Sequence, residues 1–127
     1  MILALLGIAL SRNAVKAQDK DKIYDFTSVK QQPTYPGGIS KFYDYLSKEI
    51  KYPAEAKKNK VQGKVFASFV VEKDGSLSDV RITRGLSKET DAEAKRVLLK
   101  SPKWKPAIHN GKPVRIKYNI NVNFKNS

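Results

Sequence analysis

The sequence predicts a small α+β domain, in which a small antiparallel sheet of three main strands carries two helices packed on one face. First, the 127 residues fit one domain, and 40% hydrophobic against 29% charged residues is a globular balance. Second, apolar and polar residues alternate over 113–124, as in a half-buried strand, and residues 64–72 would be apolar on both faces of a strand, as in a central one. Third, residues 40–50 and 90–100 carry apolar side chains three or four positions apart, as helices do.

The chain begins with an uncharged apolar run, MILALLGIAL. A membrane span needs about 20 apolar residues, so this run is too short for one, but it has the length of a signal-peptide core. A small-x-small pattern ends at Ala17. We therefore expect residues 1–17 to be a signal peptide or a truncated membrane segment, with a buried amino-terminal helix as the alternative. Residues 18–34 then form a polar arm or linker, in which residues 23–26, Ile-Tyr-Asp-Phe, could add a short edge strand.

The first helix follows a turn signal, YPGG, at positions 35–38. Its apolar face consists of Ile39, Phe42, Leu46 and Ile50. Pro53 then stops the helix and can itself begin a short one over residues 53–59.

A hairpin of two strands comes next. Residues 64–72 have apolar side chains on both faces, which predicts a central strand. An Asp-Gly pair ending at Gly75 forms the turn, because glycine adopts the positive φ that tight turns require. Residues 77–84 return with Val80 and Ile82 directed inward.

The second main helix is expected over residues 90–100. Thr90 and Glu93 have the spacing of a capping box, and Pro102 ends the helix. Its buried stripe is Ala94, Val97 and Leu98.

The last strand has the most regular pattern in the chain. An Asn-Gly turn ending at Gly111 separates residues 103–108 from residues 113–124. The helix before it supplies a crossover long enough to place this strand beside the first, which gives the sheet order second–first–last. The last strand is then an edge, whose backbone groups are open to pairing with another strand.

A series of short motifs runs through the chain in a fixed order. They are YPGG at 35–38, Tyr52-Pro53 with Ala56, QGKV at 62–65, FVV at 69–71, DGS at 74–76, Val80 with Ile82, Asp91 with Glu93-Ala94, SPKWKP at 101–106, NGKPV at 110–114 and Phe124. Each motif alone is common, but together they resemble the carboxy-terminal domain of the TonB energy-transducer family, in the form frequent among Bacteroidetes. The resemblance covers roughly residues 33–125, and we assign the domain to residues 35–127.

The resemblance implies a non-enzymatic domain in the periplasm of a Gram-negative bacterium, anchored in the inner membrane where an anchor precedes it. Members of this family grip a short segment of outer-membrane receptors, the TonB box, which adds as a strand to the sheet edge. TonB-dependent receptors are therefore the expected partners in proton-motive-force-coupled transport across the outer membrane. An ExbB–ExbD-type motor is a further expected partner if a membrane anchor exists upstream. Whether the domain forms a homodimer is left open.

Carried over by position, the resemblance places receptor-peptide binding on the last strand and beside the Tyr-Pro pair. The candidate residues are Tyr52, Pro53, Val114, Arg115, Ile116, Lys117, Tyr118, Asn119, Ile120, Asn121, Val122, Asn123 and Phe124. Tyr52 and Pro53 also have a purely structural interpretation, in which Pro53 begins a helix and Tyr52 packs on the sheet. Trp104 is expected to close the core rather than to contact a ligand, because its large apolar area favours burial. His109 is expected to be exposed.

Composition excludes several classes of site. With no cysteine, the chain has no thiolate zinc site and no cysteine nucleophile, and a single histidine excludes a histidine metal cluster. The carboxylates form no evident acid–base pair, and there is no Gly-x-Ser-x-Gly motif. We therefore expect no catalytic residue, no metal and no cofactor.

The charge leaves one alternative open. Lysine and arginine number 25 against 12 aspartate and glutamate, which gives a formal net charge of +13. A freestanding cationic envelope-binding or nucleic-acid-binding protein, without an energy-transducing role, would have such a charge. However, the basic residues are spread along the chain and most are lysines, whereas base recognition favours arginine. We therefore expect no nucleic acid as a partner.

Overall fold

The computed structural model describes residues 22–125, so the expectation for residues 1–17 lies outside the described part. The elements are β1 (Ile23–Tyr24), the 3-10 helix η1 (Phe26–Ser28), α2 (Ile39–Glu49), α3 (Ala54–Lys58), β2 (Gly63–Val71), β3 (Leu77–Arg84), α4 (Lys88–Leu99), β4 (Ala107–His109) and β5 (Lys112–Phe124). Within residues 22–125, no helix combines the length and the apolar character needed to cross a bilayer.

The sheet has the order β1-β5-β2-β3, and β4 also pairs with β5. β2 pairs antiparallel with both β3 and β5, which confirms the predicted order of the three main strands. β1 is an addition at one end of this order and runs parallel to β5, whereas β4 lies off this order and pairs antiparallel with β5. β2 is central, and its last five residues are all buried.

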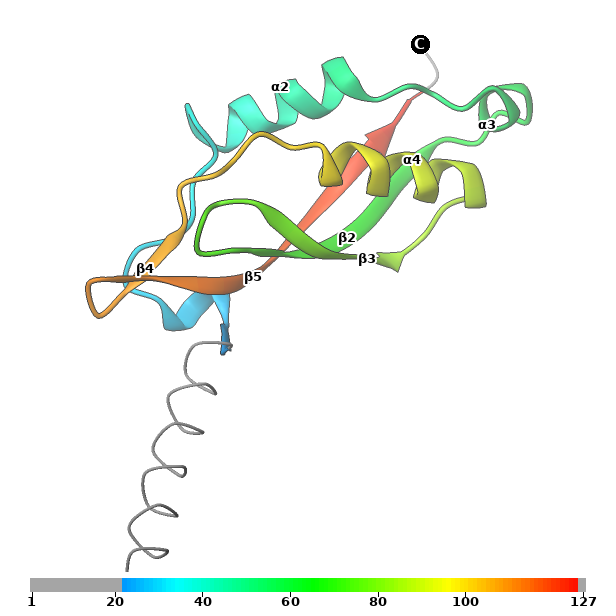
Figure 1. Ribbon diagram of the computed structural model, residues 1–127. Coiled ribbons are helices and arrows are strands. Elements are labelled where there is room, and N and C mark those ends of the chain that lie inside the picture. Colours follow the sequence, from blue (N-terminus) through cyan, green and yellow to red (C-terminus); the bar gives the residue numbers. More distant parts are fainter. Residues whose placement is uncertain (1–21, 126–127) are drawn as a thin grey trace, which may run out of the picture.

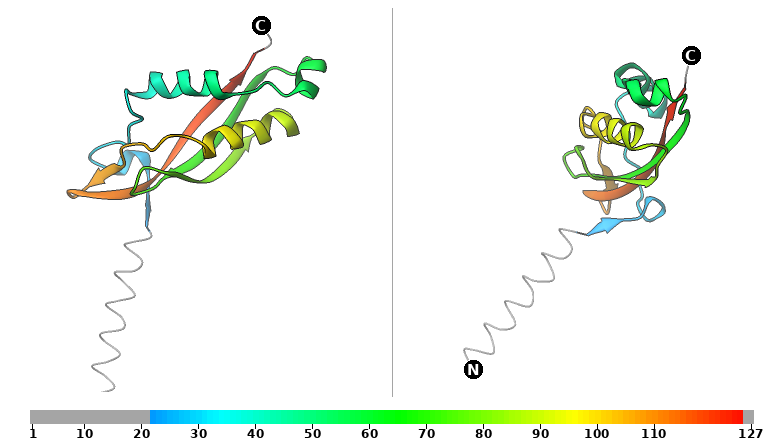
Figure 2. Two further views of the ribbon diagram at one scale, coloured as in Figure 1. Left: turned by 45° about the horizontal axis from the view of Figure 1, so that its top comes forward. Right: turned by 90° about the vertical axis from the view of Figure 1, so that its right-hand side faces the viewer.

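The helices cover one face of the sheet, as predicted. Figures 1 and 2 show α2 and α4 on the same side of the strands. Between them and the sheet lies the core, built from Phe42 and Leu46 of α2, Val97 and Leu98 of α4, and the inward side chains of β2 and β5. The molecule is therefore a two-layer α+β domain.

Trp104 lies in this core, with only 3% of its surface exposed. Its ring centroid is 4.8 Å from that of Phe42 and 5.7 Å from that of Phe69, so it joins α2 to β2. The prediction that Trp104 closes the core is confirmed.

The start of α4 differs from the predicted one. The cap is Ser87, whose Oγ accepts the Thr90 N–H at 3.2 Å, while the Ser87 N–H donates to Thr90 Oγ1 at 3.0 Å. The predicted box at Thr90 and Glu93 is therefore wrong. The Glu93 carboxylate binds the Arg96 guanidinium at 2.7 Å and does not reach back along its own helix.

Residues 22–34, the described part of the expected polar arm, lie against the domain. Val29 is buried in the core cluster. Gln31 and Ile108 exchange backbone hydrogen bonds of 3.0 and 2.9 Å, and Thr34 bonds to Lys105 in the same way. This segment holds β1 in place beside β5.

His109 is half-buried, so the prediction that it is exposed is wrong. Its ring centroid lies 5.0 Å from that of Tyr24 in β1. The covering strand comes from the amino-terminal segment, which the local pattern around His109 does not reveal.

Candidate functional site

One side of β5 is open along most of its length. β2 pairs with β5 from Ile116 to Phe124. On the opposite side, β1 pairs with Arg115 and Ile116, and in the described part of the chain no strand pairs with residues 117–124 on that side. We call residues 117–124 the open edge.

Three of the candidate residues on the last strand lie outside the open edge. Val114 pairs with Ala107 of β4, and Arg115 pairs with Ile23 of β1. Ile116 is paired on both sides. The free edge therefore does not extend over the whole expected range 114–124, because β1 pairs with Arg115 and Ile116 on this side of β5.

The direction of the backbone groups follows from the hairpin between β2 and β3. Glu72 donates its N–H to the Ser76 carbonyl at 2.8 Å, so its backbone groups face β3. Because these directions alternate along a strand, the groups of Val71 face β5. The register between β2 and β5 is continuous, so every second residue of β5 from Ile116 onward faces β2.

The remaining residues of β5 direct their N–H and C=O groups to the open edge. They include Asn119, Asn121 and Asn123. Their side chains are also on the helix-free face of the sheet, as the sequence predicts, while those of Ile120, Val122 and Phe124 are buried. The open edge thus offers three successive donor–acceptor pairs to another strand.

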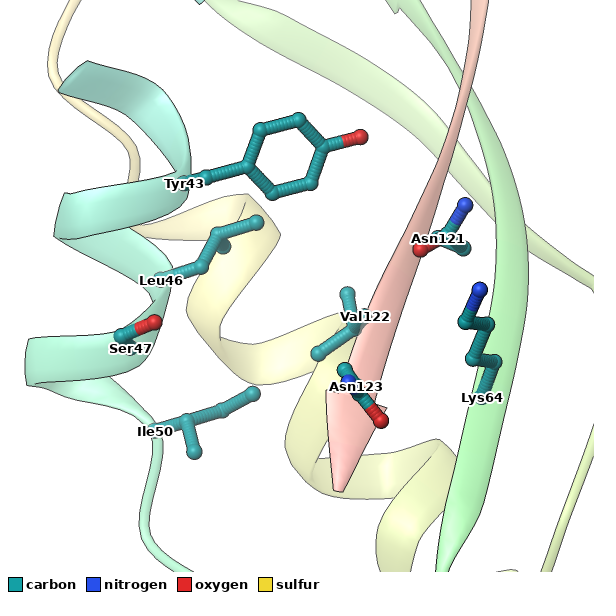
Figure 3. A pocket seen from close by; sticks show the side chains of 8 residues that line it. All are labelled: Tyr43, Leu46, Ser47, Ile50, Lys64, Asn121, Val122 and Asn123. Atoms are coloured by element: carbon teal, nitrogen blue, oxygen red, sulfur yellow. The ribbon is translucent and has the colours of Figure 1, made fainter. Parts of the chain in front are cut away.

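α2 lies beside the open edge and forms a groove with it (Figure 3). A pocket of about 310 Å³ is lined by Tyr43, Leu46, Ser47, Ile50, Lys64, Asn121, Val122 and Asn123. A second pocket of about 290 Å³ continues past the end of the helix and is lined by Ser47, Ile50, Tyr52, Asn123, Phe124 and Lys125. The two pockets share Ser47, Ile50 and Asn123, so they form one groove.

The groove has an apolar base. Leu46 and Val122 are buried, and Figure 3 shows their side chains directed toward each other across the gap between helix and strand. The ring of Tyr43 lies at the rim and is 40% exposed. Each pocket is lined by one lysine, Lys64 or Lys125, and neither is lined by an acidic residue.

The spacing of the groove matches that of a strand. Val122 and Phe124 lie on the same face of β5, two residues apart, and each lines one of the pockets. Side chains of a strand lie on one face at every second residue. A strand added to the open edge can therefore place two alternate side chains in the two pockets.

Tyr52 and Pro53 lie at the α3 end of the groove. The Tyr52 hydroxyl donates to the Val61 carbonyl, and its ring centroid is 5.9 Å from that of Phe124. Pro53 immediately precedes α3 as its amino-terminal cap residue. Tyr52 thus packs on the sheet, as the structural interpretation predicts, and also lines the second pocket.

Glu93 fixes the segment just before Tyr52. Its Oε2 accepts the Lys51 backbone N–H at 2.6 Å, and Arg96 binds both carboxylate oxygens at 2.7 Å. The hydrogen bonds from Arg96 outweigh burial and lower the pKa of Glu93, with a further contribution from the Lys51 N–H. The carboxylate therefore stays charged and ties this wall of the groove to α4.

Toward β1, aromatic rings lie beside the open edge. The ring of Phe26 in η1 lies 5.3 Å from that of Tyr118, edge to face, and Phe26 is 44% exposed. Tyr118 also stacks on Phe69 at 5.7 Å. Burial raises the pKa of Tyr118, and the nearby Tyr43 adds to this effect. Tyr118 therefore stays a neutral phenol.

Several groove residues were not predicted from the sequence. They are Tyr43, Leu46, Ser47, Lys64 and Lys125. Tyr43, Ser47 and Ile50 are spaced by four and three, so they form a second stripe beside the core stripe of α2. An exposed tyrosine on such a stripe is the one local signal of a groove. Within residues 22–125, no group of three histidine, cysteine, aspartate or glutamate side chains is placed to hold a metal ion.

The comparison with known families agrees with this geometry. Residues 48–126 match the family described as the Gram-negative bacterial TonB protein C-terminal.

The chain belongs to this TonB C-terminal family.

Two solved TonB structures share the fold. The carboxy-terminal domain of Helicobacter pylori TonB, solved by NMR, has a TM-score of 0.53 and 18% identity, over 68% of this chain and 91% of that one. The corresponding domain of Pseudomonas aeruginosa TonB has a TM-score of 0.50 and 25% identity, over 60% of this chain and 77% of that one. No curated protein sequence matches the chain. The resemblance to TonB and the α+β fold class are thereby confirmed.

Proposed function

We propose that this TonB-type domain binds peptide segments of outer-membrane receptors in the periplasm, by strand addition to residues 117–124. One observation carries the proposal: the open edge of β5 faces a groove whose pockets repeat at the spacing of a strand. Through this contact the domain serves proton-motive-force-coupled transport across the outer membrane, as the TonB family does.

The groove also defines the chemistry of the peptide. Side chains on the helix side enter pockets based on Leu46, Val122 and Phe124, so apolar residues are favoured at two positions separated by one. An apolar side chain that becomes fully buried contributes about 1.5–3 kcal/mol. The intervening residues lie over the helix-free face near Asn121 and Lys64, which suits amide or acidic side chains.

Calorimetry with peptides from outer-membrane receptors of the same organism tests the proposal. Asn119→Pro removes a backbone donor from the open edge without disturbing the pairing with β2, because proline cannot donate to a ladder. We expect this variant to fold normally and to lose binding. Asn119→Ala is the matched control, since it keeps the N–H, and it should bind within about threefold of the parent.

A third variant checks the assigned direction of the backbone groups. The Ile120 groups face β2 and its side chain is buried, so Ile120→Pro should unfold the sheet. If folded Asn119→Pro binds as well as the parent, strand addition at this edge is wrong. If polyanions bind with steep salt dependence and no receptor peptide does, the cationic-surface alternative replaces it.

A further inference from the structure

Resting on the proposed function, we propose that β1 and η1 are a built-in stop that confines the receptor peptide to residues 117–124 and sets its register. The stop is part of this chain, and it lies at the end of β5 next to β4 (Figure 1). It determines the length of peptide that the site recognises.

The first observation is that the edge is already paired where β1 begins. Ile116 is opposite Val71 of β2 on one side and Tyr24 of β1 on the other. The backbone groups of Ile116 face β2, so the groups that make this parallel pair belong to Tyr24. A peptide strand that extended past Lys117 would have to displace Tyr24.

The second observation is that β1 is held in place from several directions. The ring centroids of Tyr24 and His109 are 5.0 Å apart. The Lys22 ammonium lies over the Tyr24 ring, 4.6 Å from the centroid of that ring. Farther along, Gln31 exchanges two backbone hydrogen bonds with Ile108. Because β1 is tethered to the domain, a separate peptide must compete with a strand present at high effective concentration.

The third observation is the side chain that the stop presents to the open edge. The pairing with β5 ends at Tyr24, and η1 follows as a turn that the Ser28 N–H closes on the Asp25 carbonyl at 3.0 Å. The turn leaves the Phe26 ring edge-to-face with Tyr118 and 44% exposed. The terminal residue of a bound peptide would therefore meet an aromatic wall in place of further open backbone.

A length series of peptides tests the stop. A strand along residues 117–124 contributes about one residue per edge residue, so about eight residues fill the site. With the full chain, we expect affinity to rise up to about eight residues and then to stay within about twofold for peptides of about ten and twelve residues, extended at either end. Tyr24→Pro removes the donor that holds β1, so in this variant the longest peptides should gain about tenfold over the eight-residue peptide.

Ile23→Pro is the matched control. It introduces the same residue one position earlier, where the backbone groups face away from β5 and the side chain is 42% exposed. This variant should keep the plateau of the parent. A plateau lost equally in both variants would contradict the assigned role of Tyr24.

Hydrogen exchange of the parent provides a readout that needs no variant. The Tyr24 amide should stay protected when a twelve-residue peptide is bound, since the stop holds. If long peptides keep gaining affinity in the parent and the Tyr24 amide loses protection, the stop is wrong while strand addition stands. If peptides of no length bind the parent, the proposed function fails, and the stop fails with it.

Discussion

Glu72 and Arg115 form a two-bond, partly buried ion pair on the helix-free side of the sheet. Arg115 Nε and Nη2 donate to the two carboxylate oxygens at 2.8 and 3.1 Å, and both side chains are 24% exposed. The hydrogen bond from Arg115 lowers the pKa of Glu72, against the opposing effect of burial, and a hydrogen bond from Ser78 adds to it. The pair connects the end of β2 to the start of β5, beside β1.

This pair predicts a pH dependence. The pKa of Glu72 is lower in the folded state than its unfolded-state value of 4.5. The ionised carboxylate therefore stabilises the fold at pH values above 4.5, and this contribution is lost as the pH falls through the folded-state pKa. Glu72→Gln should therefore lower the free energy of unfolding by about 1–2 kcal/mol at neutral pH. The loss should shrink when urea unfolding is repeated well below pH 4.5.

The control is the exposed pair of Asp79 and Arg81, at 2.9 Å, with side chains 47% and 70% exposed. Solvent screens this pair, so Asp79→Asn should change stability by less than about 0.5 kcal/mol at neutral pH. If Glu72→Gln shows the same small, pH-independent effect, the proposed contribution of the Glu72–Arg115 pair is contradicted.

At the residue scale, side-chain direction was largely predictable and side-chain environment was not. The alternation along the last strand correctly places Asn119 outward and Ile120 inward, because a strand has a fixed period of two. The apolar area of Trp104 correctly predicts burial. His109 and Tyr43 owe their surroundings to segments distant in sequence, which no local pattern contains.

The hairpin between β2 and β3 docks onto the segment that carries Trp104. The Trp104 N–H donates to the Gly75 carbonyl at 2.8 Å. Gly75 has a φ of +87°, and a Cβ built there would lie 1.8 Å from the Trp104 carbonyl oxygen. Glycine is required here both for its conformation and for the close approach of two backbones.

Gly75→Ala should therefore cost more stability than Gly111→Ala. Both glycines have positive φ, +87° and +74°, so each substitution carries about 1–2 kcal/mol of backbone strain. Only the alanine at position 75 also collides with a neighbour, which should add about 1–3 kcal/mol, because nothing lies within 4 Å of a Cβ at position 111. Equal losses in urea unfolding would show that the hairpin does not rest on the Trp104 backbone.

At the element scale, the sequence predicts the elements better than their boundaries. β3 falls at the predicted positions, and β2 is shifted by a single residue. α4 begins earlier than expected, because Ser87 and Thr90 form reciprocal side-chain to backbone hydrogen bonds at its start. In addition, Asp91 accepts the Leu86 N–H at 2.9 Å. Several residues in this stretch are competent caps, and tertiary contacts decide which one is used.

At the scale of the whole molecule, the order of the three main strands follows from the hairpin and the crossover, which the sequence shows. The short parallel strand β1 does not follow in the same way. β1 has only two residues, which is too short for a sequence pattern to predict that it pairs with β5. The end of the open edge could therefore be found only from the structure. The open side of the last strand was therefore predictable, and the length of the open edge was not.

The formal net charge of +13 is also a property of the whole molecule. Lys64 and Lys125 line the groove, so acidic peptides should associate more strongly at low salt. Backbone pairing and apolar contacts do not release counterions, and binding should therefore persist at high salt. The salt dependence of binding therefore distinguishes strand addition from a general affinity for polyanions.

Residue-resolved hydrogen exchange on β5, with and without a receptor peptide, tests strand addition most directly. In the free protein the amides of Tyr118, Ile120 and Val122 should exchange slowly, because they face β2, while those of Asn119, Asn121 and Asn123 exchange fast. Saturating peptide should slow the three asparagine amides to the range of their neighbours. Asparagine amides that still exchange fast when the peptide is bound would contradict strand addition at this edge.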